Sequence, residues 1–448
     1  MNKGILGIDL GTSSVKALFV KGDEKVKFRE GYESIGIDGW INALKRIFSR
    51  LDMNKVSAIA FSSQVGTYIA DSTFVTNWND PCGKEQLEEI LERFPQQTFV
   101  EEISMPQPKL TSYPIPRLKY IREVYGNFSE VCQPKDFIIR LLTGDFVTDK
   151  YSWRGLANLE TAEYSRLFLD FLGVSAEALP EIKQPTDLAG LTVENPFGIP
   201  CDIPVYVGCN DFFASLVGMG INRPGQMFDI TGTSEHIGVI TENIDPDTKM
   251  VSGPYFAHNV SYGVTASSGA SMDFCLKNFD MEFDVDKVLD NNPPIFLPYL
   301  CGERAPIFDS NARGMFFGIE KGCSKKELAY SVMEGIAFSL RHIYENLPQN
   351  KPCSLTVSGG GAVNDTLNSI KAELFDIPVT TLQENDTSAL GAVMLGAIGC
   401  GMFGDIESAA DCFCKAESEV LPKGIWRDRL LKRFETYKKL YPAVKELF

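Results

Sequence analysis

The sequence is poor in histidine and has no long uninterrupted hydrophobic run. Its three histidines, His236, His258 and His342, are far apart, which argues against a histidine-rich metal site. No apolar stretch approaches the roughly 18 residues of a membrane-spanning helix, and no charged segment followed by an apolar one precedes the first glycine turn. We therefore expect a cytoplasmic protein that does not bind membranes.

Paired cysteine motifs are absent as well. Eleven cysteines are scattered between Cys82 and Cys414, and none forms a C-x-x-C pair. An odd number at irregular spacing predicts reduced, mostly buried thiols rather than a disulfide framework. Cys412 and Cys414 are the closest pair, and their spacing is not that of a zinc site.

Positive charge is in short supply. The chain has 43 Lys and Arg against 59 Asp and Glu, a net charge of −16. Nucleic acids and anionic membranes would repel such a surface. Any anionic ligand must therefore be bound by groups within its own site and not by the overall charge of the protein. With 448 residues and 44% hydrophobic residues, the chain predicts two or three globular domains.

The most informative motif lies near the start of the chain. Gly7-Ile8-Asp9-Leu10-Gly11-Thr12-Ser13-Ser14 joins two apolar runs, at 5–8 and 15–20, and predicts a β-hairpin whose glycine-rich tip can hold phosphate. Asp9 would repel phosphate unless a divalent cation lay between them. The motif thus favours a magnesium nucleotide, although an ordinary hairpin turn remains the alternative.

The same theme returns in the middle of the chain. An apolar-leaning run at 226–230, the turn Thr231-Gly232-Thr233-Ser234 and a second run at 237–240 predict another phosphate-type hairpin. It follows Pro224-Gly225, a turn signal at which we place a domain boundary. We therefore predict an α/β protein with domains at 1–223 and 224–448.

Periodicity predicts further elements around these hairpins. Strands are expected at 56–62, 203–208 and 355–358, and helices at 41–51, 84–94, 116–125, 325–344, from about 363 to 375, and around Trp426–Tyr437. The region from about 101 to 200 gives weaker signals.

Several separated segments carry a family resemblance over essentially the whole chain. They are Gly7–Thr12, Gly208–Asp211, Thr231–Ser234, Phe296–Pro306 and Ser358–Asn364, with Trp78-Asn79-Asp80, Leu141–Gly144 and Ser388–Ala392 as partial matches. In this order they resemble the FGGY carbohydrate kinases of the actin-like ATPase superfamily. The resemblance implies two actin-like (ribonuclease-H-like) α/β domains with a central cleft, and ATP, Mg²⁺ and a sugar or polyol as ligands.

The resemblance also implies roles for individual residues. Asp211 matches the family's catalytic base, a role that transfer to an un-ionised hydroxyl requires; its structural alternative is a helix N-cap. Asp9 is expected to organise magnesium through water. Gly11, Thr12 and Ser13 are expected to face the transferring phosphate and Gly232 and Thr233 the other phosphates, while Gly269, Gly360 and Asn364 would contact the nucleotide. A cap role for Asn364 stays open, as does the direction of Lys16.

The sugar pocket departs from the family pattern. Val65 and Gly66 stand where xylulose kinases usually have Met-His and glycerol kinases Arg-Glu, Phe212 replaces an Asn or Gln, and Cys82 stands where an arginine is common. Gln64 and Asp80, together with Asp211, remain as candidate substrate contacts. The aromatic residues Trp78, Tyr113, Trp153 and Phe212 are candidate walls or core residues.

The sequence therefore favours an ATP-dependent kinase of a small ketose or polyol, with a ketopentose such as xylulose or ribulose as the leading candidate. A nucleotide-binding sugar sensor and a chaperone-type ATPase are the alternatives. Dimers are common in the family, so a homodimer is an expected assembly. For Glu303, Arg304 and Arg313 we expect a structural arginine–carboxylate pair.

Overall fold

The computed structural model of the chain describes residues 4–32, 35–244, 249–283, 292–348 and 352–448. The chain divides into two compact units. Unit 1 comprises Met1–Gly220 and Asp386–Phe413, and unit 2 comprises Ile221–Asn385 and Cys414–Phe448. The first crossing lies close to the expected boundary at 223/224. Residues 386–413 return to unit 1, so this unit is formed by two segments of the chain.

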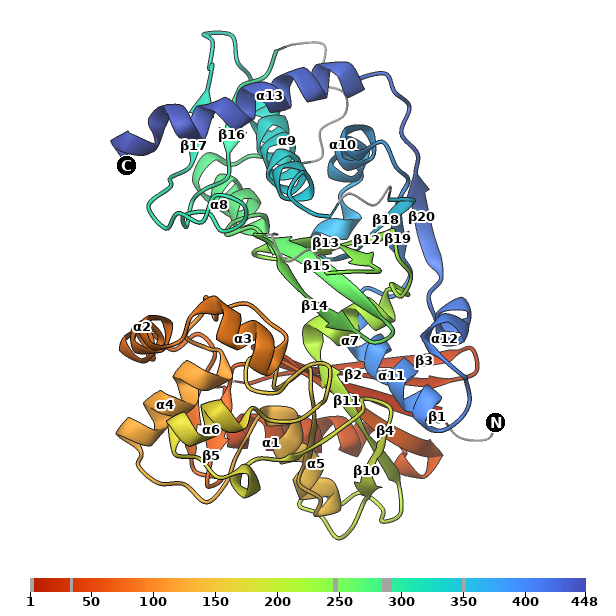
Figure 1. Cartoon of the computed structure of the whole chain (residues 1–448). Coiled ribbons are helices and arrows are strands. Elements are labelled where there is room, and N and C mark those ends of the chain that lie inside the picture. The colour runs from red at the N-terminus through yellow and green to blue at the C-terminus, as the bar shows by residue number, and fades with distance from the viewer. Residues whose placement is uncertain (1–3, 33–34, 245–248, 284–291, 349–351) are drawn as a thin grey trace. The chain divides into compact units, whose positions relative to one another are not determined.

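Unit 1 is built on a six-stranded sheet with the order β10-β11-β4-β1-β2-β3 (Figure 1). Strands β1, β2 and β3 are consecutive and antiparallel, whereas β4 and β11 extend the sheet in parallel and β10 closes it antiparallel. The bounds are β1 Gly4–Leu10, β2 Ser14–Lys21, β3 Glu24–Gly31, β4 Val56–Ser63, β10 Leu188–Leu191 and β11 Pro204–Asn210.

Alternation along β1 sends its side chains to two different layers. Leu6, Ile8 and Leu10 pack with α1 (Ile37–Arg50) and α5 (Pro134–Thr143) in one apolar core. The intervening positions face α11 (Thr387–Gly399), where a Cβ on Gly7 would lie 2.3 Å from the carbonyl oxygen of Ala389. The glycine therefore lets α11 approach the strand closely.

Helix α11 also packs directly against α7 (Asp211–Gly218). A Cβ on Gly391 would lie 1.8 Å from the Ala214 carbonyl oxygen, and one on Gly218 would lie 2.0 Å from that of Thr387. The two helix backbones thus touch without side chains between them.

Unit 2 contains a seven-stranded sheet with the order β14-β15-β13-β12-β18-β19-β20. From β15 to β20 its pairings run antiparallel, antiparallel, parallel, parallel and antiparallel, the same series as from β3 to β10 in unit 1. The bounds are β12 Gln226–Thr231, β13 Glu235–Thr241, β14 Val251–Tyr255, β15 His258–Val264, β18 Ser354–Gly359, β19 Val379–Leu382 and β20 Ala416–Val420. The repeated hairpin theme of the sequence therefore belongs to a repeated sheet topology.

Helices α9, α10 and α13 lie on one side of this sheet and contribute to its apolar core (Figure 1). Their bounds are α9 Lys325–Tyr344, α10 Asp365–Phe375 and α13 Arg427–Val444, and α8 spans Gly269–Phe279. A short antiparallel pair, β16 Ile295–Leu297 and β17 Met315–Phe317, adjoins them.

Unit 1 also contains a series of shorter elements, several of them within 101–200, where the sequence gives weak signals. They are β5 Tyr68–Ala70, β6 Phe74–Thr76, β7 Val131–Cys132, β8 Val147–Asp149, β9 Glu181–Lys183, α2 Lys84–Arg93, α3 Gln96–Ile103, α4 Pro114–Val124, α6 Arg166–Leu172 and, further along, α12 Ile406–Phe413. The α/β class and the elements expected from periodicity are confirmed. Helix α13 begins just after Trp426, and a 3₁₀ turn at Gly360–Val363 precedes α10.

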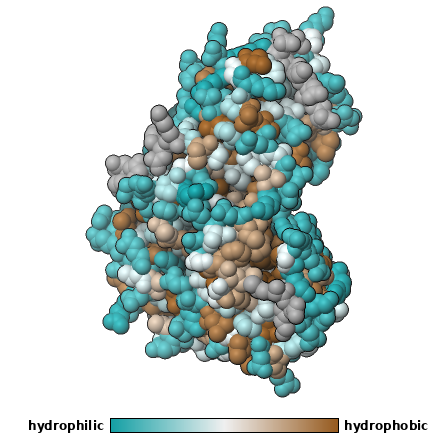
Figure 2. Space-filling view, turned by 90° about the vertical axis from the view of Figure 1, so that its right-hand side faces the viewer, coloured by the Kyte–Doolittle hydropathy of each residue, from teal (hydrophilic) through white to brown (hydrophobic). Residues whose placement is uncertain are grey.

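The hydropathy of the helices and of the surface, and the exposure of the cysteines, can be compared with the expectations from the sequence. Within the described ranges, no helix is long and apolar enough to cross a membrane, and Figure 2 shows hydrophilic residues interspersed with smaller hydrophobic groups. All eleven cysteines are free, as expected, but the prediction that most are buried was wrong. Only Cys132, Cys209 and Cys275 are buried, since most of the others lie in loops and near element ends.

The contact between α7 and α11 yields a prediction about stability. Gly391→Ala places a methyl group against the Ala214 carbonyl oxygen and should destabilise unit 1 by about 1–3 kcal/mol, which is typical of overpacking. Gly404→Ala is the control, because a Cβ there meets nothing within 4 Å. Thermal unfolding should show a midpoint several degrees lower for Gly391→Ala alone; equal midpoints would contradict the assigned contact.

Candidate active site

Asp9 lies near the end of β1 and faces α11. Its Oδ1 accepts a hydrogen bond from the Ser62 hydroxyl at 2.9 Å, and its Oδ2 accepts one from the Ser388 hydroxyl at 2.6 Å. Burial raises the pKa of Asp9, although the Ser388 hydrogen bond and the charge of Lys16 oppose the shift. The carboxylate is thus held rigidly by two hydroxyls contributed by β4 and α11.

The oxygen donors around Asp9 define which kind of magnesium site this part of the chain could form. In the part of the chain that the structure describes, no group of three or more His, Cys, Asp or Glu side chains could enclose a metal. Asp9 is a single carboxylate, and each of its oxygens accepts one of the hydroxyl bonds described above. Mg²⁺ commonly keeps several waters and binds through one or two carboxylates together with substrate phosphates. The donor set fits that mode and not a closed protein cage.

Lys16, whose direction the sequence left open, points toward a carboxylate of unit 1. It pairs with Asp9 in the β1–β2 register, and its ammonium lies 2.7 Å from a carboxylate oxygen of Asp386. This ion pair ties β2 to the residue that precedes α11.

The tip of the first hairpin holds Gly11, Thr12 and Ser13. The Trp78 indole N–H donates to the Thr12 hydroxyl at 3.1 Å, and that hydroxyl donates to Gln64 Oε1 at 3.0 Å. Because an indole can only donate, this relay fixes the Gln64 amide with its nitrogen facing away from Thr12. Gln64 is only 3% exposed, and its Nε2 has no hydrogen-bond partner among the described residues.

Asp211 is the first residue of α7, and Asn210 is the N-cap. The Asn210 side chain accepts from the Phe213 N–H at 2.9 Å, so the cap role considered for Asp211 belongs to its neighbour. Asp211 is half-buried and accepts from the Phe212 N–H at 2.8 Å. Burial, together with the charge of Asp9, raises the pKa of Asp211 to about 7.

The other substrate candidates differ in how much freedom they have. The Asp80 carboxylate accepts from the Asn77 N–H at 2.7 Å and closes the turn after β6. Gly66 has φ +82°, and a Cβ there would lie 2.9 Å from Ser112 Cβ and 3.2 Å from Trp78 Cβ. Trp153 is fully buried, which settles its role as a core residue, whereas Trp78 is 41% exposed.

In unit 2, the structure brings Gly232, Thr233 and Gly269 together. The N–H of Gly269 donates to the Gly232 carbonyl at 3.0 Å, and the N–H groups of Ser268 and Ala270 donate to the Thr233 carbonyl. A Cβ on Gly269 would lie 2.5 Å from the Gly232 oxygen. The start of α8 is thereby fastened to the tip of the β12–β13 hairpin.

The triglycine segment joins the same hairpin through Thr231. Its hydroxyl donates to the Ser358 carbonyl at 2.7 Å and accepts from the Gly361 N–H at 2.7 Å. Gly360 is exposed, and a Cβ there would meet nothing within 4 Å. Asn364 is the N-cap of α10 and also donates to the Phe283 carbonyl, so the structural reading left open for Asn364 is confirmed.

A buried ion cluster that the sequence did not reveal lies behind this hairpin. The Lys371 ammonium lies 2.5 Å from Asp229 and 2.7 Å from Glu235, and the Ser268 hydroxyl donates to Glu235. Burial raises the pKa of Asp229, as does the charge of Glu235. The cluster links β12, β13, α10 and the residue before α8.

Glu303 is structural, but not in the expected way. Its carboxylate accepts from the N–H groups of Ala266 and Arg304, each at 2.7 Å, and from the Ser339 hydroxyl. Arg313 donates to the carbonyl groups of Ser310 and Ala312. The predicted arginine–carboxylate pair is absent from the described contacts because backbone groups take its place.

Comparison with known proteins identifies the class of protein. Residues 4–218 match the N-terminal domain and residues 228–400 the C-terminal domain of the FGGY family of carbohydrate kinases. The chain belongs to this family. It is therefore a phosphotransferase with an alcohol group as acceptor, which uses ATP to phosphorylate a carbohydrate.

Individual relatives cover the chain nearly end to end. The xylulose kinase of Lactococcus lactis is 27% identical over 99% of this chain and 97% of its own length. The crystal structure of ligand-bound xylulose kinase from Lactobacillus acidophilus superposes with a TM-score of 0.86 at 26% identity, covering 99% and 98% of the two chains. Gluconate kinase from Lactobacillus acidophilus gives a TM-score of 0.84 at 27% identity, with the same coverage. These likenesses confirm the two-domain actin-like fold.

Proposed function

We propose that this carbohydrate kinase transfers the γ-phosphoryl group of ATP to a hydroxyl of a small ketose or polyol, with Asp211 as the general base. The observation that carries the proposal is the placement of Asp211 at the start of α7, half-buried, with a pKa raised to about 7 by burial and by Asp9. A base with a pKa near the operating pH combines a useful deprotonated fraction with a strong driving force for proton transfer.

In this mechanism the Asp211 carboxylate accepts the proton of the sugar hydroxyl as its oxygen bonds to the γ-phosphorus. The bond from that phosphorus to the bridging oxygen of ADP breaks at the same time, and charge spreads over the transferring group. Asn210 caps α7 and so fixes the direction from which Asp211 approaches the hydroxyl.

The donor at Gln64 supports a sugar contact. Its buried Nε2 lacks a partner among the described residues, and a buried donor left unpaired costs about 1–3 kcal/mol. A sugar oxygen that accepts this hydrogen bond would recover that energy. Thr12 already donates to Gln64 and accepts from Trp78, so its side chain orients the amide, while the backbone at Gly11, Thr12 and Ser13 faces the phosphate.

Nucleotide binding is assigned to unit 2. The hairpin tip at Gly232 and Thr233 and the start of α8 at Gly269 form one fastened turn, and glycine permits close approach of phosphate. Gly360 presents open backbone for adenosine. Asn364 holds this surface in place through its cap on α10.

Asp9 would hold magnesium through the ion's water shell, because it offers a single carboxylate already steadied by Ser62 and Ser388. When bound, the ion neutralises part of the phosphate charge. For the sugar, xylulose or ribulose is the leading candidate, supported by the xylulose kinases among the relatives. Gly66 lacks the side chain that xylulose kinases usually have at this position, so the activity assay should include a wider set of sugars.

One prediction concerns the base. Asp211→Asn removes the proton acceptor and should lower kcat about 10²–10⁴-fold, with little change in ADP affinity. A coupled ADP-release assay over ketoses, aldoses, polyols and sugar acids measures this, with the exposed Asp170→Asn as the matched control. Full activity of Asp211→Asn on the preferred sugar would overturn the base assignment. Absence of sugar-stimulated release in the wild-type chain would favour the sensor, and sugar-independent release the chaperone-type ATPase.

Another prediction concerns the pH dependence of phosphorylation. Since the base must be deprotonated and the pKa of Asp211 is about 7, kcat/KM for the sugar should rise about tenfold per pH unit below that value and level off above it. Removing the Asp9 charge in Asp9→Asn should move the inflection to lower pH, because like charges raise a carboxyl pKa. A rate independent of pH between 5 and 8 would contradict the mechanism.

A further prediction concerns the Gln64 side chain. Gln64→Leu keeps a similar volume but removes the donor, and should reduce kcat/KM for the sugar about 5- to 150-fold, the equivalent of 1–3 kcal/mol. The KM for ATP should change little. Gln97→Leu, on the exposed face of α3, is the control. If both variants keep wild-type kcat/KM values, Gln64 does not contact the sugar.

A further inference from the structure

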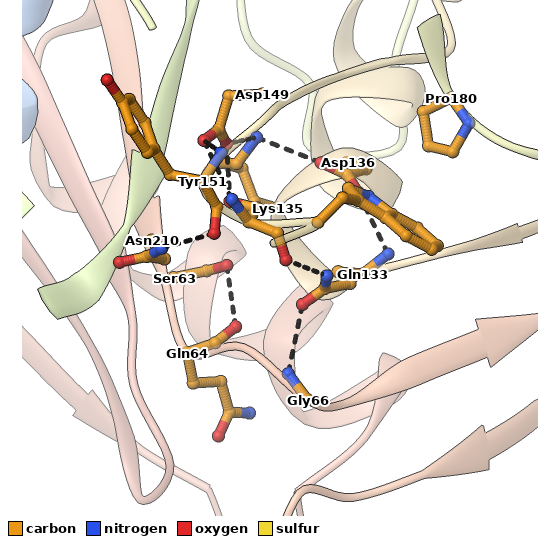
Figure 3. Close-up of polar contacts among 12 residues, drawn as sticks. Ser63, Gln64, Gly66, Gln133, Lys135, Asp136, Asp149, Tyr151, Pro180 and Asn210 are labelled. Carbon is orange, nitrogen blue, oxygen red and sulfur yellow. Dashed lines mark hydrogen bonds and ion pairs between the residues drawn. The ribbon is translucent and has the colours of Figure 1, made fainter. Parts of the chain in front are cut away.

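A second buried ion cluster, made of side chains that the sequence did not single out for chemistry, lies in unit 1. The Lys135 ammonium lies 3.0 Å from an oxygen of Asp136 and 3.1 Å from an oxygen of Asp149, and all three side chains are 0% exposed (Figure 3). Buried ions are costly unless each is paired and hydrogen-bonded. What this cluster holds in place therefore matters.

The cluster holds the backbone that follows β8. Asp149 accepts from the N–H groups of Tyr151 and Ser152 at 2.9 and 3.0 Å, and from the Ser152 hydroxyl. Asp136 accepts from the Trp153 indole at 3.1 Å. Residues 151–153 are thus fixed by the two carboxylates that Lys135 neutralises.

Two side-chain amides from outside this segment donate to its carbonyl groups, and each bonds to a different neighbouring element. Gln133 donates to the Ser152 carbonyl at 2.5 Å and accepts from the Gly66 N–H at 3.2 Å. Asn210 donates to the Tyr151 carbonyl at 2.9 Å and accepts from the Phe213 N–H. Figure 3 shows this series of contacts from Gly66 to Asn210, with the Gln64 side chain directed away from it.

The two ends of the series are both functional under the proposed mechanism. One end is the backbone of Gly66, next but one to the Gln64 donor. The other is the first turn of α7, which begins with Asp211. Each amide uses its oxygen on one end and its nitrogen on the fixed segment, so neither can rotate without losing a buried hydrogen bond.

We propose that Gln133 and Asn210 are positioning residues: with the Lys135–Asp136–Asp149 cluster they form one hydrogen-bonded unit that sets the 64–66 loop and the first turn of α7 relative to each other. The inference rests on the proposed function for its catalytic consequence. The proposed coupling between the two ends does not depend on that function.

Hydrogen exchange tests the coupling directly. Gln133→Glu keeps the acceptor for Gly66 but loses the donor to Ser152, and Asn210→Ser keeps the α7 cap but cannot reach Tyr151. We expect Gln133→Glu to speed exchange at residues 210–217 about tenfold, and Asn210→Ser to do the same at residues 64–70. Gln107→Glu is the matched control, because its Nε2 bonds the Phe94 carbonyl elsewhere in unit 1 and should change neither region. Unchanged exchange at the far end in both variants overturns the coupling.

A double-mutant cycle on sugar phosphorylation tests the positioning role. Each single variant should lower kcat about tenfold or more, with ADP affinity and the Gln107→Glu enzyme unaffected. Because both act through one unit, the double variant should lose clearly less than the product of the single losses. Multiplicative losses overturn the positioning role. If the two variants show coupled hydrogen exchange but the wild-type chain phosphorylates no sugar, the proposed function is contradicted and the coupling is not.

Discussion

The contact of α11 with β1 and α7 is the constraint on which the candidate chemistry of unit 1 depends. The backbone of α11 approaches those of β1 and α7 closely because glycine stands at Gly7, Gly218 and Gly391. The approach brings the Ser388 hydroxyl to Asp9 and fixes the axis of α7, whose first residue is Asp211. A Cβ at any of the three glycines would lie 2.3 Å or less from a backbone carbonyl oxygen of the partner element, so none of them can be replaced without a shift of the backbone.

Among the described residues, the acidic composition leaves few unpaired lysines near the two glycine-rich hairpins. The lysine nearest the first hairpin, Lys16, is paired with Asp386, and the buried Lys371 behind the second hairpin is paired with Asp229 and Glu235. Neither lysine therefore supplies a spare positive charge for phosphate. Under the proposed function, the triphosphate depends on backbone N–H groups at the glycine turns and on the metal that Asp9 would hold. A chain with a net charge of −16 needs such local groups to bind an anion.

Local sequence signals predicted what is local. Both hairpins, α9 and the strand before the triglycine follow from apolar period and glycine placement, and their bounds agree closely. Partners distant in sequence could not be predicted. Ser388 lies 379 residues from Asp9, and its signal was only a run of small residues resembling the family. The return of 386–413 to unit 1 needs the same long-range packing. Asn210 was missed as the cap because neighbouring Asn and Asp are equally good cap formers.

The backbone conformation at Gly66 limits what the 64–66 loop offers to a ligand. At φ +82°, Gly66 occupies a region that side chains disfavour, and Ser112 and Trp78 fill the space that a Cβ would need. Its N–H is taken by Gln133, so Gly66 has neither side chain nor N–H to offer a sugar. Selectivity among polyols usually comes from buried groups that penalise an unmatched hydroxyl. Under the proposed function, Gln64 and Asp211 are the groups assigned to that task, and Trp78, which reaches Gln64 through the Thr12 hydroxyl, is the candidate apolar wall beside them.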